Sequence, residues 1–257
     1  MKKYQVIALD LDGTLLTSEK TVSPRTLAAL LKCMEVGMQP VIVTGRVSSS
    51  IPDLLPPGFP VIPWICSHGA EVYLNSTMIA ENLISVPQAQ EVVRLTRTLA
   101  PAMTVSTIMD GKWYANLPLD IPSLDIPYEI ADLHSVIDRP VPKLVCDLSA
   151  LDDVDAFRQI LPPHCELMIS GSLGEIVADC VSKVSALRTL MGKWGMTLHD
   201  AVAFGDHLPD LEMLVACGLG VAMGNAVPEV KEAADIITSS CDEDGIAEVL
   251  ESLANPK

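Results

Sequence analysis

With 257 residues, the chain is long enough for one large domain or for two domains of moderate size. Hydrophobic residues make up 49% and charged residues 19%, which favours a folded protein with a sizeable core over a disordered one. The 33 Asp and Glu residues outnumber the 17 Lys and Arg residues, so the net charge is −16. This charge argues strongly against a nucleic-acid partner, because such binding depends on Lys and Arg side chains that neutralise phosphates. An anionic substrate would need local positive charge or a metal ion.

The sequence also restricts where the protein functions and what it binds. No apolar run approaches the roughly 18–20 residues that span a bilayer, so we expect no membrane partner. The seven cysteines are odd in number and scattered, and none forms a Cys-x-x-Cys pair. We therefore predict reduced thiols in a cytoplasmic protein. Without a heptad pattern, we expect a monomer or a weak homo-oligomer.

The N-terminal part of the chain has the succession of elements that a parallel α/β sheet requires. Residues 4–9 are a short apolar run that ends in acidic residues, as a buried strand does before its loop. Ser23 and Pro24 predict the start of a helix, and Gly37 predicts its end. Residues 40–43 and 61–66 predict two further buried strands. Strand–helix–strand succession favours an α/β sheet, in which ligands bind at the carboxyl ends of the strands.

The pattern changes near residue 83, where short strands and helices mix without regular alternation. Helices are expected at residues 88–99 and 152–161, and strands at 104–109, 113–117, 144–148, 166–170 and 175–179. This mixture indicates a separate α+β unit. The α/β pattern then returns, with helices at 184–194, 208–216 and 229–233 and strands at 201–204, 218–221 and 236–237. We therefore expect residues 1–82 and 182–257 to form one discontinuous domain, into which residues 83–181 are inserted.

Two carboxylates follow the first predicted strand. Asp10 and Asp12 are two residues apart on an extended backbone, so their side chains point the same way, and Gly13 permits a sharp turn. Such a pair can bind Mg²⁺, and one carboxylate can attack an electrophile while the other transfers protons. A solvated turn without chemistry is the alternative.

Three more segments carry candidate residues, and those with Thr44 and with Asp206 lie at the same predicted edge of the sheet. Thr44, in Thr-Gly-Arg, could hold an oxyanion together with backbone N–H groups, or could be part of a plain strand-to-helix turn. Lys183 precedes a helix and could neutralise a phosphate, or could be an ordinary surface lysine. Asp206 and Asp210 add two carboxylates after another apolar strand. Because clustered carboxylates repel one another, a Mg²⁺ site is the simplest physical resolution.

Taken in chain order, these segments resemble a known family. Asp-x-Asp-Gly-Thr, Thr-Gly-Arg, a lysine before a helix and Gly-Asp-x-x-x-Asp are similar to the four motifs of the haloacid dehalogenase (HAD) superfamily of phosphohydrolases. The inserted unit and the tail at residues 221–226, 234–235 and 244–247 resemble its Cof-type subgroup, which has a class IIB cap. The resemblance covers essentially the whole chain. It implies a Rossmann-like parallel-sheet core with an inserted α+β cap that determines substrate specificity.

The resemblance also implies a role for each motif residue. Asp10 would attack phosphorus and form an aspartyl-phosphate, while Asp12 would protonate the leaving alcohol and later activate water. Asp10, the backbone carbonyl of Asp12 and Asp206 would hold Mg²⁺, with Asp210 in support. The phosphoryl oxygens would be bound by a set of side chains and backbone groups from Asp10, Leu11, Asp12, Thr44, Gly45, Arg46 and Lys183.

The sequence departs from the family pattern at two positions. Pro209 stands where the subgroup has asparagine, so an amide donor near the metal and phosphate is lost, although proline also suits the first turn of a helix. His68 stands where the family has the asparagine of Asn-Gly-Ala, and it is either a substrate contact or a hydrogen-bonded loop residue. His207 beside Asp206 and Asn225 in the tail are further candidate modulators.

The leading hypothesis is a Mg²⁺-dependent phosphatase that hydrolyses a small phosphomonoester, such as a sugar phosphate or a related metabolite. One alternative is a catalytically weakened phosphate-ligand binding or regulatory protein, which Pro209 and His68 motivate. Another is a phosphotransferase or phosphomutase, which would share the aspartyl-phosphate intermediate but pass the phosphoryl group to an alcohol. Release of free phosphate without an added acceptor separates these functions.

Overall fold

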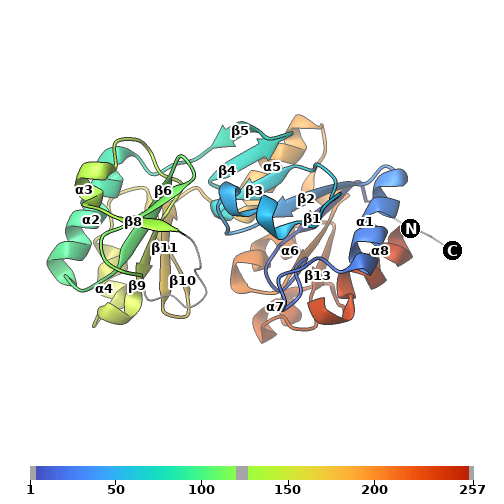
Figure 1. Cartoon of the computed structure of the whole chain (residues 1–257). Coiled ribbons are helices and arrows are strands. Elements are labelled where there is room, and N and C mark those ends of the chain that lie inside the picture. The colour runs from blue at the N-terminus through green and yellow to red at the C-terminus, as the bar shows by residue number, and fades with distance from the viewer. Residues whose placement is uncertain (1–3, 120–126, 255–257) are drawn as a thin grey trace. The chain divides into compact units, whose positions relative to one another are not determined.

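The computed structural model describes residues 4–119 and 127–254. The chain divides into two compact units, the first made of Met1–Glu81 and Ser182–Lys257 and the second of Asn82–Val181. Each unit has its own sheet and its own hydrophobic core (Figure 1). Within the described ranges, no helix combines the length and the apolar character needed to cross a membrane.

An eight-stranded sheet in the order β14-β13-β12-β1-β2-β3-β4-β5 organises the first unit. Its strands are β1 (Val6–Leu9), β2 (Gln39–Val43), β3 (Trp64–Cys66), β4 (Glu71–Leu74), β5 (Thr77–Glu81), β12 (Ala201–Gly205), β13 (Leu219–Ala222) and β14 (Ile236–Ile237). β1 pairs in parallel with β2 and β12, and all four of its residues are buried. Because a central parallel strand is covered on both faces, its sequence is apolar without alternation.

The predicted parallel sheet is confirmed from β14 to β3, whereas the edge beyond β3 is antiparallel. β4 pairs antiparallel with both β3 and β5. Asn75 and Ser76 join β4 to β5 with φ angles of 50° and 62°. Positive φ at both central residues is what a type I′ two-residue hairpin turn requires. This hairpin was not predicted from the sequence.

Helices in the first unit pack in two groups beside the sheet (Figure 1). They are α1 (Pro24–Glu35), α5 (Lys183–Lys193), α6 (Leu211–Ala216), α7 (Pro228–Ala233) and α8 (Gly245–Ala254). α1 contacts α8, while α6 contacts both α5 and α7. α1 begins as predicted, since the Ser23 hydroxyl oxygen accepts a hydrogen bond from the Thr26 N–H at 3.0 Å. α8 was not predicted, although Ile246, Ala247 and Leu250 bury one of its faces.

The second unit is an α+β domain, as its mixed sequence pattern predicts. Its sheet has the order β10-β11-β9-β6-β7-β8. The strands are β6 (Val105–Met109), β7 (Lys112–Ala115), β8 (Tyr128–Ile130), β9 (Leu144–Asp147), β10 (Cys165–Ser170) and β11 (Leu173–Ala178), and the helices are α2 (Val86–Leu99), α3 (Leu133–Val136) and α4 (Val154–Gln159). The three helices gather on one face of this sheet and bury a core around Phe157 (Figure 1). The short strand β8 and helix α3 were not predicted.

The core of the first unit gives a stability prediction. Phe204 lies in β12 and is fully buried, whereas Val215 on α6 is 62% exposed. Replacing Phe204 with alanine leaves a cavity, so we expect the free energy of unfolding of Phe204→Ala to fall by about 3–5 kcal/mol. Chemical denaturation measures this change, and Val215→Ala is the control with little expected effect. Equal losses in the two variants would contradict this packing.

Candidate active site

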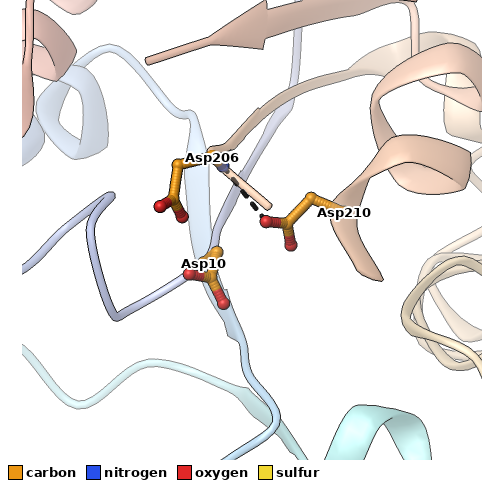
Figure 2. Close-up of side chains that lie close together, drawn as sticks. All are labelled: Asp10, Asp206 and Asp210. Carbon is orange, nitrogen blue, oxygen red and sulfur yellow. Dashed lines mark hydrogen bonds between the residues drawn. The ribbon is translucent and has the colours of Figure 1, made fainter. Parts of the chain in front are cut away.

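Three aspartates from separate parts of the sequence meet at one edge of the first unit's sheet. Asp10 follows β1 and Asp206 follows β12, the parallel neighbour of β1. Asp210 ends a short 3₁₀ turn, Leu208–Asp210, that leads into α6. Carboxylate oxygens of the three residues lie within 4.8 Å of one another (Figure 2). The sequence prediction that these carboxylates converge agrees with this geometry.

Lys183 supplies positive charge to this aspartate cluster. It is the first residue of α5, after the helix cap Ser182, and its side chain is 4% exposed. Its ammonium donates to Asp10 Oδ1 at 2.5 Å and to Asp210 Oδ1 at 2.6 Å. Burial alone would lower the pKa of Lys183, but the charges of the two carboxylates outweigh it and raise the pKa. Lys183 is therefore a buried cation and not an ordinary surface lysine.

Burial destabilises the ionised form of the aspartates. It raises the pKa of the Asp10 carboxyl, an effect that the Lys183 charge opposes and that the Asp210 charge increases. Burial also raises the pKa of Asp206 to about 6, and repulsion from Asp210 acts in the same direction. Both carboxyl groups therefore gain from any further positive charge brought close to them.

Asp210 has a structural role in addition to its contact with Lys183. Its Oδ2 accepts hydrogen bonds from the backbone N–H groups of Asp206 and His207, both at 3.1 Å, and Figure 2 shows the first of these. These bonds hold the turn that carries Asp206. Pro209 lies in the same turn, at the helix-start position that its ring favours. His207 contacts Asp210 here through its backbone.

The loop that carries Asp10 approaches Asp206 closely at Gly13. Gly13 has a φ of 73°, and a Cβ atom there would lie 2.4 Å from Asp206 Oδ2. The Thr14 hydroxyl donates to Asp206 Oδ1 at 3.1 Å. Asn225 also holds this loop, since its Nδ2 donates to the Gly13 carbonyl oxygen at 2.8 Å. Asn225 therefore positions this loop.

The Thr44 loop is held by the segment that contains His68. Thr44 is buried, and its carbonyl oxygen accepts from the His68 N–H at 3.0 Å. The His68 ring lies so close to Gly45 that a Cβ atom on Gly45 would be 2.5 Å from its Cε1 atom. His68 itself has a φ of 60° and is buried. These contacts show a hydrogen-bonded residue that holds the Thr44 loop, and a contact between His68 and the substrate stays a prediction.

Asp12 is paired with two cations. Arg46 donates two hydrogen bonds to its carboxylate, from Nε at 2.5 Å and from Nη2 at 2.7 Å. Lys20 donates a third at 2.8 Å to Oδ1. Although partial burial would raise the pKa of Asp12, these bonds outweigh it and lower the pKa to about 2. Asp12 is therefore ionised in this state of the site.

Sequence reasoning missed Thr14 and Lys20, and it placed Leu11 in the phosphate site without naming the atoms involved. Thr14 lies within the quoted motif, but its bond to Asp206 depends on how β1 and β12 pair. Lys20 is eight positions from Asp12, and no spacing rule connects a turn lysine with a carboxylate at that distance. Leu11 has a fully buried side chain, and its carbonyl oxygen accepts from the Thr14 and Leu16 N–H groups, which shapes the loop.

Comparison with known proteins identifies the family. A model of the haloacid dehalogenase-like hydrolases matches residues 7–250. The chain belongs to this family. Its two-sheet architecture and its relatives place it among the Cof-type, subclass IIB phosphatases, which act on small phosphomonoesters. The predicted HAD fold, with a core sheet and a separate inserted cap sheet, is confirmed.

Several relatives that are similar over nearly the full length are phosphatases. The 5-amino-6-(5-phospho-D-ribitylamino)uracil phosphatase YcsE of Bacillus subtilis is 30% identical, over 96% of this chain and 94% of that protein. The pyridoxal phosphate phosphatase YbhA of Escherichia coli is also 30% identical, over 96% and 98%. The crystal structure of a haloacid dehalogenase-like hydrolase from Bacteroides thetaiotaomicron has a TM-score of 0.84 and 29% identity, covering 98% of this chain and 100% of that one.

The aspartate cluster fits a hard divalent cation. Mg²⁺ prefers carboxylate oxygens, and Asp10, Asp206 and Asp210 place such oxygens close together, as is typical of the metal site in this family. The three carboxylates repel one another, and a bound cation would reduce this repulsion. The Thr14 bond and the contact with Gly13 hold the Asp206 carboxylate in place before any ion arrives.

The cluster gives a prediction about metal binding. An ion that binds only the folded state raises the melting temperature, so excess Mg²⁺ is expected to raise the Tm of the wild-type protein. Asp206→Asn is expected to lose most of that shift, because one anionic ligand is gone. Asp53→Asn, at an exposed position away from the cluster, is the control and is expected to keep it. An undiminished shift in Asp206→Asn, measured by thermal denaturation, would contradict this assignment.

Proposed function

We propose that this chain is a Mg²⁺-dependent phosphatase that hydrolyses a small phosphorylated metabolite, such as a sugar phosphate, through an aspartyl-phosphate on Asp10. The observation that carries the proposal is the buried Asp10 carboxylate, which lies beside Lys183 and two further aspartates. A phosphoryl group brought to Asp10 would meet a nucleophile, a fixed cation and candidate metal ligands. Positioning and charge neutralisation are most of what phosphoryl transfer requires.

In the first step, a carboxylate oxygen of Asp10 forms a bond to phosphorus while the bond between phosphorus and the leaving oxygen breaks. The leaving alkoxide takes a proton from Asp12. In the second step, the Asp12 carboxylate removes a proton from water, which attacks the aspartyl-phosphate and releases phosphate and Asp10. The Asp12 ion pair with Arg46 must loosen for the first proton transfer, because Asp12 is ionised while paired.

The remaining motif residues would bind the metal ion and the phosphoryl group. Asp10, Asp206 and the backbone carbonyl of Asp12 would hold Mg²⁺, with Asp210 in support, and the ion would neutralise charge on the phosphoryl oxygens. Lys183 and the Thr44 hydroxyl would bind those oxygens directly. The Thr44 oxygen accepts from the Arg46 N–H at 3.1 Å, and a hydroxyl that accepts keeps its own proton to donate. Backbone groups of Leu11, Gly45 and Arg46 would complete the phosphate site.

The relatives support a small substrate. Two of them are a ribitylaminouracil phosphate phosphatase and a pyridoxal phosphate phosphatase, both similar across nearly the whole chain. In our proposal the inserted unit, residues 83–181, is the cap that selects the organic part of the substrate. Pro209 favours one other candidate, a weakened enzyme that chiefly binds a phosphorylated ligand, because proline lacks the side-chain amide of the family's asparagine.

Substitution of the nucleophile tests the function. We expect Mg²⁺-dependent release of free phosphate from members of a panel of small phosphomonoesters, and a loss on the order of 10³-fold or more in Asp10→Asn. Asp53→Asn is the control and keeps the wild-type rate. If folded wild-type protein releases phosphate from no panel member, the binding-protein function gains support. If Asp10→Asn retains the wild-type rate, another residue is the nucleophile.

Pro209 gives a second prediction. Pro209→Asn restores an amide beside Asp206 and Asp210, so its turnover is expected to exceed that of the wild type. One preorganised polar contact can contribute on the order of 10²-fold in rate in comparable sites, which sets the upper end of the expected gain. Pro228→Asn, at the corresponding start of α7, controls for the loss of a helix-start proline. Unchanged or lower turnover in folded Pro209→Asn would contradict the idea.

A further inference from the structure

Lys20 is built into the edge of the active site by a defined turn. The turn spans residues 17–21, in which the Lys20 N–H donates to the Thr17 carbonyl oxygen and the Thr17 N–H donates to the Thr21 carbonyl oxygen, both at 2.9 Å. Lys20 has a φ of 57°, an uncommon conformation for a residue with a side chain. The backbone therefore directs this side chain at an energetic cost, which the surrounding turn has to offset.

The same loop is tied to the C-terminal part of the first unit. The Ser18 N–H donates to Asp242 Oδ1 at 2.8 Å, and the Ser23 hydroxyl donates to Asp244 Oδ1. These contacts join segments more than two hundred residues apart in the sequence. The loop that carries Lys20 is therefore held by hydrogen bonds on both sides of this residue.

The charge around Asp12 is unbalanced in favour of cations. Arg46 and Lys20 bring two positive charges to one carboxylate, in a protein whose net charge is −16. The Lys20 side chain is 53% exposed, and Asp12 takes one of the three donors of its ammonium. The solvent side of this ammonium can therefore reach an incoming oxygen without breaking the contact with Asp12.

The mechanism places that ammonium next to the leaving group. To transfer its proton, Asp12 has to come within about 3 Å of the ester oxygen. Lys20 Nζ is 2.8 Å from Asp12 Oδ1, so it would lie within about two hydrogen-bond lengths of an ester oxygen that contacts Oδ1. An oxygen on the carbon next to the ester carbon is within reach of Nζ, whereas a distant part of the substrate is not.

We propose that Lys20 is a specificity-determining residue that hydrogen-bonds an oxygen on the carbon adjacent to the ester carbon of the substrate. The inference rests on the proposed function and restricts the range of its substrates. The preferred substrates carry a hydroxyl at that carbon, as sugar and polyol phosphates do. Esters that lack the hydroxyl, including those of a methylene attached to an aromatic ring, are hydrolysed less efficiently.

A matched pair of substrates tests the inference. Glycerol 3-phosphate carries the neighbouring hydroxyl and n-propyl phosphate lacks it. A hydrogen bond to a charged group contributes enough to change kcat/KM by about tenfold or more, so we expect the wild-type enzyme to prefer glycerol 3-phosphate by that factor. Lys20→Met keeps the length of the side chain and removes the charge, and it is expected to bring the ratio close to one. Lys32→Met, at an exposed position on α1, is the matched control and keeps the wild-type ratio.

The outcomes separate this inference from the proposed function. p-Nitrophenyl phosphate has no neighbouring hydroxyl, so Lys20→Met is expected to lower kcat/KM for glycerol 3-phosphate by about tenfold more than it lowers kcat/KM for this ester. A wild-type enzyme that hydrolyses this ester but does not discriminate within the pair would overturn the inference alone. A Lys20→Met variant that keeps the preference for glycerol 3-phosphate would also overturn it. The same holds for a variant in which kcat/KM falls equally for all three esters. A folded wild-type protein that hydrolyses none of them would overturn the proposed function itself.

Discussion

Like charges held close together in a protein interior need a counter-charge. Asp10, Asp206 and Asp210 lie within 4.8 Å of one another at the end of an apolar parallel sheet, and burial raises the pKa of both Asp10 and Asp206. Lys183 balances part of this charge through its bonds to Asp10 and Asp210. The position of α5 is therefore coupled to the positions of the loops after β1 and β12. A divalent cation would complete the balance, and a phosphoryl group is the kind of anion that such a combination of charges can hold.

The surrounding backbone keeps the site assembled. The loop after β1 contacts Asp206 at Gly13, where no side chain would fit, and Asn225 hydrogen-bonds that loop from the C-terminal part of the unit. The segment around His68 holds the Thr44 loop in a similar way. Both loops thus depend on a contact from a segment outside them. Because Asn225 and His68 hold these loops, their substitution is expected to affect the rate through the position of the loops.

The sequence was sufficient to predict the elements with strong local signals. β1 and β12 were recognised because buried parallel strands are short apolar runs, and α1 because Ser23, Pro24 and Gly37 mark its ends. The convergence of Asp10, Asp206 and Asp210 could be predicted because carboxyl ends of parallel strands share one edge. The β4–β5 hairpin was missed because its strands are short and partly exposed, and its one local signal was Asn75 in the turn.

The contacts of individual side chains could not be predicted in the same way. Lys20 meets Asp12 because a turn with positive φ directs it there, and Asp12 is shared with Arg46 from a different strand end. The hydrogen bonds that Asp210 accepts from the N–H groups of its own turn could not be predicted either. The motif suggested a metal ligand and gave no sign that this side chain holds the turn. These details depend on tertiary geometry, which no spacing in the sequence encodes.

The central claim is that Asp10 carries the phosphoryl group between two chemical steps. The most direct measurement uses Asp12→Asn with p-nitrophenyl phosphate and Mg²⁺, followed by rapid quenching and mass analysis of the peptide that spans residues 4–20. The good leaving group needs no proton from Asp12, whereas the second step does need Asp12 as a base. We therefore expect a burst of one p-nitrophenolate per enzyme molecule, with a phosphoryl group on Asp10. A burst that leaves the phosphoryl group on a different peptide, or on none, would contradict the claim.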